Sequence, residues 1–152
     1  MEWLSQITDL ADIIERLTNY VRGNNAKKAR LIRELKVNLR AFEVQRRKAT
    51  ANFDLLLKQL SNREIRKQID EGYNFNRMRN ELIQAEHIHH PRNKNCIGKD
   101  CKWVFEHIDL KIEELRFMQQ SAGSLNQMEG VNLGLQFSNL YHRLRLLADF
   151  IC

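Results

Sequence analysis

The chain has 152 residues, which fits one domain with a hydrophobic core, residues 1–152, and is too short for two. Apolar residues make up 43% of it and charged residues 29%, a balance typical of a globular protein and not of a disordered chain. Six glycines and one proline are fewer turn-forming residues than a β-rich protein needs. No apolar run approaches the roughly 20 residues of a membrane-spanning helix, and the first residues do not resemble a signal peptide.

The positive charge of the chain is concentrated in one segment. The whole chain has a net charge of +6, whereas residues 22–48 alone carry +8, which leaves −2 for the remainder. Such a local excess of cations indicates an anionic partner more strongly than a high overall pI does.

Cysteine usage points to a reducing compartment. The three cysteines, at positions 96, 101 and 152, are an odd number, and no export signal accompanies them. We therefore expect a cytoplasmic protein with free thiols and no disulfide framework.

Apolar residues at alternating spacings of three and four predict helices along the whole chain. The first apolar face runs from Trp3 to Val21 and stops before Gly23, because glycine accepts the left-handed conformation that ends a helix. The second face continues from Ile32 to Leu60, through the position of Arg46. This spacing predicts one long helix over residues 26–60, about 50 Å in length.

Two shorter helices are expected next. Ser61 and Glu64 have the spacing of a capping box, so a short helix should begin there. Another helix is predicted to run from Phe75 to about His89, where Pro91 prevents simple continuation. Its inward side chains, chosen by helical spacing, are Phe75, Met78, Leu82 and Ala85.

Two long helices complete the chain. A loop over residues 90–100 ends at Asp100, a suitable N-cap for the first of them. A second loop over 121–130 precedes the last helix, whose apolar face runs from Leu133 to Ile151, although a capping-box spacing at Ser124 leaves an earlier start open. No segment alternates with a period of two. We therefore expect an all-α fold, an up-and-down helical bundle of four main helices plus a short extra helix, packed near-antiparallel.

The candidate binding surface is a basic row on the second helix. Arg33, Lys36, Arg40 and Arg47 lie within about 60° of helical angle, clear of the apolar face. Such a row could bind the phosphates of nucleic acid or another anionic polymer, without base-specific reading, because no groove-reading motif is present. The alternative is that these side chains form the solvated face which any bundle helix needs.

A second candidate is a group of metal-binding residue types near the middle of the chain. The weak candidates for metal ligands are His87, His89, His90, Cys96 and Cys101. Zinc needs four ligands in a tetrahedron, but this spacing is not that of a standard knuckle, and Cys101 also fits an apolar helix face. We therefore assign no metal and no cofactor, and interpret the group as a polar loop.

A third pattern is close to that of helical endoribonucleases of the HEPN class. These enzymes use an arginine, often followed by a polar residue, then four to six residues and a histidine. Here Arg79 and Asn80 precede His87 with seven residues between the arginine and the histidine. On a helix the two side chains would lie about 80° apart and need not converge.

These patterns favour a non-enzymatic interaction or scaffold module, because no nucleophile–base pair, complete metal set or phosphate loop is present. The far half of the second helix, residues 49–60, is expected to extend about 20 Å beyond the first helix and to pack either on the later helices or on another chain. The expected partner is therefore a protein, or a second copy of the chain, bound through the second helix. Nonspecific nucleic-acid binding through the basic row is the runner-up function. A HEPN-like ribonuclease is the third.

Overall fold

The computed structural model describes residues 7, 10–22, 25–48 and 51–152, and its regular structure is helical throughout. The α-helices are α1 (Ala11–Val21), α2 (Ala26–Arg46), α3 (Phe53–Gln59), α4 (Arg63–Asp70), α5 (Cys101–Ala122) and α6 (Leu133–Ile151). Short 3-10 helices between α4 and α5 are η2 (Phe75–Arg77), η3 (Ala85–His87) and η4 (Pro91–Cys96). The described residues contain no strand, so the prediction of an all-α protein is confirmed. None of the described helices is long and apolar enough to cross a membrane.

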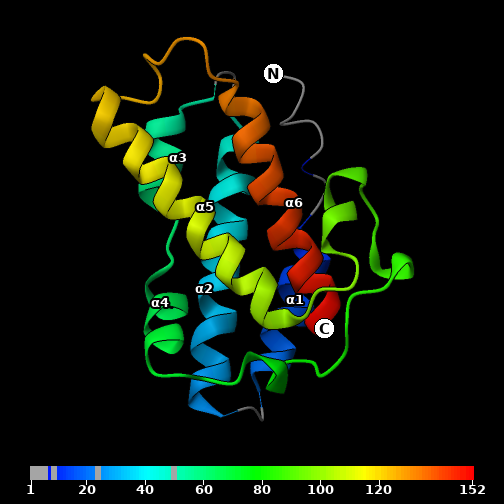
Figure 1. Ribbon diagram of the computed structural model, residues 1–152. Helices are drawn as coiled ribbons and strands as arrows, with labels where there is room; N and C mark the ends of the chain where they lie inside the picture. The colour runs from blue at the N-terminus through cyan, green and yellow to red at the C-terminus, as the bar shows by residue number, and fades with distance from the viewer. Residues whose placement is uncertain (1–6, 8–9, 23–24, 49–50) are drawn as a thin grey trace.

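Helix α2 is the central helix of the fold. It contacts α1, α3, α4 and α6, while α5 packs on α6 and also contacts α3 and α4. Figure 1 shows α5 and α6 in front of α2, with α3 and α4 on one side and α1 on the other. One cluster of buried apolar side chains includes residues from every one of these helices.

The apolar faces of the long helices are buried, as their spacing predicts. The buried side chains of α2 are Ile32, Leu35, Leu39 and Phe42; those of α5 are Cys101, Phe105, Ile108, Ile112 and Leu115; those of α6 are Leu133, Phe137, Leu140, Leu144, Leu147 and Ile151. Of the first predicted face, Leu10 and Leu17 are buried. Trp3 and the stop at Gly23 lie outside the described residues.

The prediction of one helix over residues 26–60 is wrong, because the chain turns after Arg46. The side-chain oxygen of Gln45, which is fully buried, accepts the backbone N–H of Asn52 at 3.1 Å. The side chain of Asn52 in turn accepts the N–H of Leu55 at 3.1 Å and caps α3. The helical spacing of apolar residues continues through this turn. The end of α2 at Arg46 therefore could not be predicted from that spacing.

The turn also changes what covers the far half of the predicted long helix. Helix α3 packs on α2 and also contacts α5, and its Leu56 and Leu57 are buried there. Later helices of the same chain therefore cover this segment. Helix α3 therefore does not protrude as a free end through which two copies of the chain could pair.

Helix α4 begins where predicted, but its N-terminus is capped from another helix. The carboxylate of Glu34, a buried residue of α2, accepts the N–H of Glu64 at 2.7 Å and that of Ile65 at 3.0 Å. The hydroxyl of Ser61 donates to the same carboxylate at 2.9 Å, and this long-range cap replaces the predicted Ser61–Glu64 capping box. A carboxylate is favourable there because it satisfies free N–H groups and the helix dipole.

The helix predicted over residues 75–89 is not formed; the chain has short 3-10 helices there, joined by extended segments. The backbone of Ile83 pairs with the segment before α5. Its N–H donates to the carbonyl of Lys99 and its carbonyl accepts from the N–H of Gly98, both at 2.8 Å. Of the side chains predicted to face inward, Phe75 and Met78 are buried, whereas Leu82 and Ala85 are exposed. Ile83 is buried in their place.

The ends of the last two helices follow the sequence more closely. The side chain of Asp100 accepts the N–H of Trp103 at 2.9 Å and caps α5, as predicted. Helix α5 ends at Gly123, whose left-handed conformation (φ 81°) suits glycine. Helix α6 begins at Leu133, so the earlier start left open by Ser124 is not used.

Candidate functional site

The predicted basic row forms an exposed face of α2. Arg33, Arg40 and Arg47 are exposed and Lys36 is partly buried. Burial lowers the pKa of Lys36, and the positive charges of Arg40 and Arg33 lower it further. In the part of the chain that the structure describes, the one ion pair of this row joins Arg47 to Glu43 at 3.6 Å. The row therefore carries an excess of positive charge.

Two exposed valines lie on the same face, and the sequence pattern had not identified them. Val37 is 49% exposed and Val44 is 42% exposed. Together with three arginines they follow alternating spacings of four and three, as along one side of a coiled-coil helix. The sequence feature that could have indicated them is a pair of apolar residues seven positions apart, outside the predicted buried face. We call this set the α2 row: Arg33, Val37, Arg40, Val44 and Arg47.

A hollow of about 260 Å³ flanks the first turns of the α2 row. Arg33 and Val37 belong to its wall on α2, and Ser61, Arg63 and Glu64 line it from the start of α4. Arg63 is exposed and adds a cation beside the row. The α2 row is thus bordered by a groove at one end.

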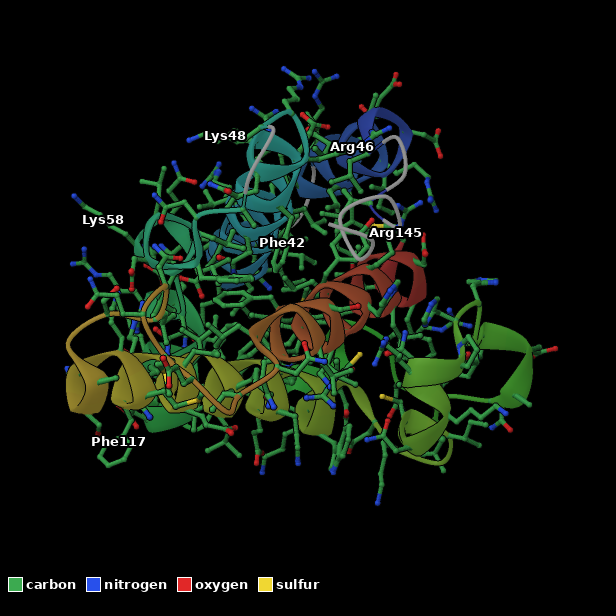
Figure 2. The ribbon with its side chains drawn as sticks, turned by 90° about the horizontal axis from the view of Figure 1, so that it is seen from above. Phe42, Arg46, Lys48, Lys58, Phe117 and Arg145 are labelled. Carbon is green, nitrogen blue, oxygen red and sulfur yellow. The ribbon has the colours of Figure 1, made fainter. Side chains whose placement is uncertain are left out.

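Helix α5 presents a second exposed apolar pair on another side of the molecule. Phe117 is 70% exposed and Leu110 is 56% exposed. Figure 2 shows Phe117 and Lys48, which follows α2, projecting from opposite sides. The α5 pair and the α2 row are therefore separate surfaces.

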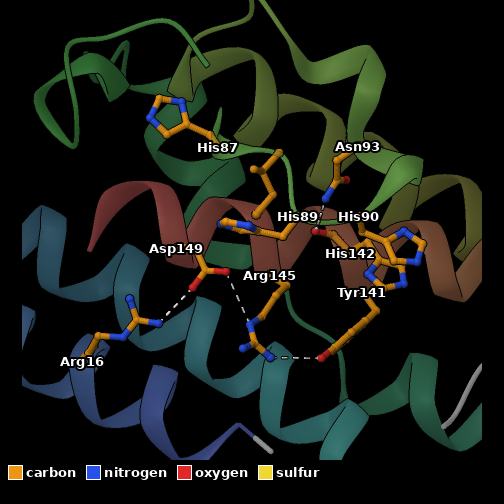
Figure 3. A pocket seen from close by; sticks show the side chains of 10 residues that line it. Arg16, His87, His89, His90, Asn93, Tyr141, His142, Arg145 and Asp149 are labelled. Carbon is orange, nitrogen blue, oxygen red and sulfur yellow. Dashed lines mark hydrogen bonds and ion pairs between the residues drawn. The ribbon is translucent and has the colours of Figure 1, made fainter. Parts of the chain in front are cut away.

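The histidines of the predicted metal patch line a pocket of about 490 Å³ between α1, α6 and the segment with η3 and η4 (Figure 3). His87, His89 and His90 contribute from that segment, within what was predicted as a helix end and a loop. His142 of α6 joins them. His142 could not be assigned to this patch from the sequence, because it is a single histidine on a helix and lies about 50 residues from the others in the chain.

The cysteines of the patch are buried and do not line this pocket. Burial raises the pKa of the Cys96 thiol and raises that of Cys101 to about 12. Buried, protonated thiols are poor metal ligands. Among the described residues, no three side chains of His, Cys, Asp or Glu are placed so that they could hold a metal ion.

A charged network forms one wall of the pocket (Figure 3). Arg16 of α1 donates to Asp149 of α6 at 3.0 Å, and Nε of Arg145 lies 3.6 Å from the same carboxylate. Arg145 also donates to the hydroxyl of Tyr141 at 3.4 Å. Two arginines and one aspartate are the charged groups among the described lining residues, so the lining is cationic by one charge when the histidines are neutral.

His90 and His142 stack on each other in this pocket. Their ring centroids are 3.6 Å apart and the rings are 10° from parallel. Burial lowers the pKa of His142 to about 4, and His90, Arg92 and Arg145 add to this effect. Burial and the charge of Arg92 also lower the pKa of His90. Both imidazoles are thus neutral at pH 7, in surroundings that disfavour further positive charge.

Arg79 and His87, which helical geometry was expected to leave apart, are neighbours. Nη2 of Arg79 lies 3.4 Å from Nε2 of His87, because the chain between them folds back instead of forming a helix. The N–H of Gln84 donates to Nδ1 of His87 at 2.8 Å, so the neutral ring carries its proton on Nε2. Two hydrogen-bond donors therefore face each other here.

Comparisons with models of protein families, with curated proteins and with solved structures find no match to this chain. The geometry and charge of the molecule therefore carry the evidence for its function. The α2 row and the histidine-lined pocket are the two features whose geometry and charge indicate a ligand.

Proposed function

We propose that the protein is a non-enzymatic interaction module whose α2 row binds an acidic, amphipathic helix of a partner protein. The observation that carries the proposal is the presence of two exposed valines and three exposed arginines on one helix face. Apolar side chains flanked by cations fit a partner that offers both apolar and acidic side chains.

The spacing of the row supports a helical partner. Positions that alternate by four and three stay on one side of a helix and can face a second helix along several turns. Such a partner would place apolar residues against Val37 and Val44 and carboxylates against Arg33 and Arg40. The groove beside Arg63 would receive further side chains from it.

Nucleic acid is the alternative ligand of the same face. Arg33, Lys36, Arg40 and Arg47 would then contact phosphates, with an affinity that falls steeply as salt rises. The row contains no aromatic side chain on which a base could stack, and exposed valines gain nothing from phosphate contacts. These features favour a protein partner.

Three labelled probes test the proposal by fluorescence anisotropy at several salt concentrations. The first is a synthetic amphipathic helix about three heptads long, with leucines on one face and glutamates beside them. The second replaces its glutamates by lysines, and the third is a single-stranded RNA. We expect the acidic peptide to bind more tightly than either of the other probes.

Paired substitutions in the α2 row separate a protein partner from a polyanion. Val37→Ser with Val44→Ser should weaken binding of the acidic peptide at least about thirtyfold, because each buried valine contributes roughly 1 kcal/mol or more. The same change should leave any RNA binding unaltered. Arg33→Glu with Arg40→Glu should abolish the binding of both probes.

The exposed pair on α5 provides the matched control. Leu110→Ser with Phe117→Ser removes even more exposed apolar surface from another side of the molecule and should change neither affinity. Tighter binding of RNA than of the acidic peptide, with no effect of the valine substitutions, would replace the proposal by nucleic-acid binding. Absence of peptide binding at low salt would end it.

A HEPN-like ribonuclease is the second candidate function, and one observation favours it. Arg79 and His87 lie 3.4 Å apart as two donors, so a phosphate oxygen between them would accept from both. Arg79 would then hold a phosphate of RNA and His87 would transfer a proton. His87 also borders the pocket of about 490 Å³.

Cleavage of a labelled single-stranded RNA tests this candidate. Activity of the wild type that His87→Ala removes and His107→Ala keeps would overturn the non-enzymatic proposal. His107 is a suitable control because it stacks on Trp103 of α5 and does not line the pocket. Uncut RNA in every sample would remove the ribonuclease from consideration.

The proposal also covers the architecture and setting of the module. We take residues 1–152 as one domain of a cytoplasmic system, in which α1, α2, α5 and α6 are the main helices of an up-and-down, near-antiparallel bundle that acts without a cofactor. The shared buried cluster supports a single domain. A symmetric pairing of two α2 rows would bring like charges together, so light scattering is expected to give the mass of a monomer, 18.1 kDa.

A further inference from the structure

The pocket between α1, α6 and the η3–η4 segment has the charge of a site for an anion. Its volume of about 490 Å³ lies within the range of small-molecule sites, roughly 300–1,000 Å³. Asp149, the one carboxylate among its described lining residues, already pairs with Arg16 at 3.0 Å and with Arg145 at 3.6 Å. Arg16 also pairs with Asp12 at 3.3 Å. Arg92, however, adds a positive charge that acts on His142, so an anion that enters would still meet a net positive charge.

Backbone contacts make two of the imidazoles into hydrogen-bond donors. Nδ1 of His87 accepts the N–H of Gln84 at 2.8 Å, and Nδ1 of His90 accepts the N–H of Arg92 at 3.2 Å. Each neutral ring must then carry its proton on Nε2. N–H donors in a pocket wall suit the oxygens of a phosphate group.

Flat aromatic side chains complete the lining. His90 and His142 form a stacked pair with centroids 3.6 Å apart, and Tyr141 lies beside them on α6 (Figure 3). Tyr141 and His142 are buried, so the partly exposed ring of His90 is the one of the three that offers a stacking surface to a nucleobase. Cations, N–H donors and flat rings in one cavity match a ligand that has both a phosphate and a planar base.

We propose that this pocket binds a mononucleotide or a similar phosphorylated small molecule, a function separate from the α2 row. Arg16 and the Nε2–H group of His87 hold the phosphate, and the ring of His90 contacts the base. Burial is the main cause that lowers the pKa of His90 and of His142, and nearby positive charges, Arg92 in both cases, add to it; an anionic ligand would compensate those charges. Binding should therefore raise both pKa values.

Adenosine monophosphate, inorganic phosphate and adenosine are the probes that test this proposal. Calorimetry at low salt measures binding, and NMR of the histidine rings follows the pKa of His90 and His142. We expect adenosine monophosphate to bind and to raise both pKa values, inorganic phosphate to do so more weakly, and adenosine to have no effect. Binding of adenosine as tight as that of its phosphate would overturn the proposal, as would absence of binding by the phosphate.

Substitutions locate the binding in the pocket. Arg16→Gln should weaken adenosine monophosphate about tenfold, the loss expected for a charge-assisted hydrogen bond. His87→Ala removes the Nε2–H donor and should also weaken it. Lys102→Gln removes the same charge from α5 and should change nothing; an equal loss there would overturn the proposal. Arg40→Glu should leave this binding intact, which separates the pocket from the α2 row.

Discussion

The carboxylate of Glu34 in α2 accepts the backbone N–H of Ile65 in α4 at 3.0 Å. The same carboxylate accepts the N–H of Glu64 and the hydroxyl of Ser61. One turn later on α2, the buried amide of Asn38 donates to the carbonyl of Ser61 at 2.8 Å and accepts its N–H at 2.7 Å. Two polar side chains of one helix thus position the start of another.

Loss of this cap should destabilise the protein. Glu34→Ala leaves the N–H groups of Glu64 and Ile65 without their acceptor and should lower the free energy of unfolding by about 2–3 kcal/mol. Urea denaturation followed by circular dichroism measures the change. Glu43→Ala removes only the surface ion pair with Arg47 and should stay within about 0.5 kcal/mol of the wild type. Equal unfolding midpoints for Glu34→Ala and the wild type would show that the cap contributes nothing.

The buried faces of the helices could be predicted from the spacing of apolar residues, because the buried positions on a helix recur with the helical period. Phe105 and Leu144 are buried for this local reason. The changes of chain direction could not be predicted in this way, because hydrogen bonds between distant residues produce them. The backbone pairing of Ile83 with Lys99 replaces a predicted helix by extended chain.

The candidate sites also differ in whether local sequence or distant contacts produce them. The arginines of the α2 row follow from local charge, and Val37 and Val44 could have been found as apolar residues outside the buried face. The pocket could not be predicted from the sequence, because Arg16 and His142 come from opposite ends of the chain and both line it only in the folded protein. Arg79 and His87 converge for a similar reason, since their contact depends on the absence of a helix between them.

The turn between α2 and α3 offers a second test. Asn52→Ala removes the acceptor for the N–H of Leu55 and for the side-chain N–H of Asn126, at 3.1 and 2.8 Å. It should lower the free energy of unfolding by about 1–2 kcal/mol, as expected for an N-cap. Thermal unfolding measures the change, with the exposed Gln59→Ala as the control. A melting temperature that matches the control would contradict this role of Asn52.

Asp54 joins α3 to the segment that follows α5. Its carboxylate accepts hydrogen bonds from the side chains of Ser124 and Gln119 and from the backbone of Leu125 and Asn126. Burial by itself would raise the pKa of Asp54, but these hydrogen bonds outweigh it and lower the pKa to about 2. The folded protein therefore favours the ionised carboxylate.

The low pKa of Asp54 predicts a contribution to stability that acid removes. Because an unfolded chain has an aspartate pKa of about 3.9, the contribution is complete above about pH 4 and is lost as the pH falls toward 2. Asp54→Asn should cost about 1–2 kcal/mol at pH 7, after allowance for solvent screening, and should flatten the loss of stability between pH 4 and 2. Urea midpoints across this range measure both effects. Asp12→Asn, at an exposed site, is the control, and an unchanged acid profile in Asp54→Asn would contradict the prediction.

His142 should make the protein sensitive to mild acid. Burial and the nearby His90, Arg92 and Arg145 lower its pKa to about 4, below the value of about 6.5 in an unfolded chain. Between these pH values the unfolded chain binds a proton that the folded protein does not, so stability falls as the pH decreases from about 6.5 toward 4, by about 2–3 kcal/mol. Urea midpoints at several pH values should show this decline in the wild type and in the control His107→Gln, and a clearly smaller one in His142→Gln, where the lowered pKa of His90 still contributes. A wild-type midpoint that stays constant over this range would mean that the pKa of His142 is the same in the folded protein as in the unfolded chain.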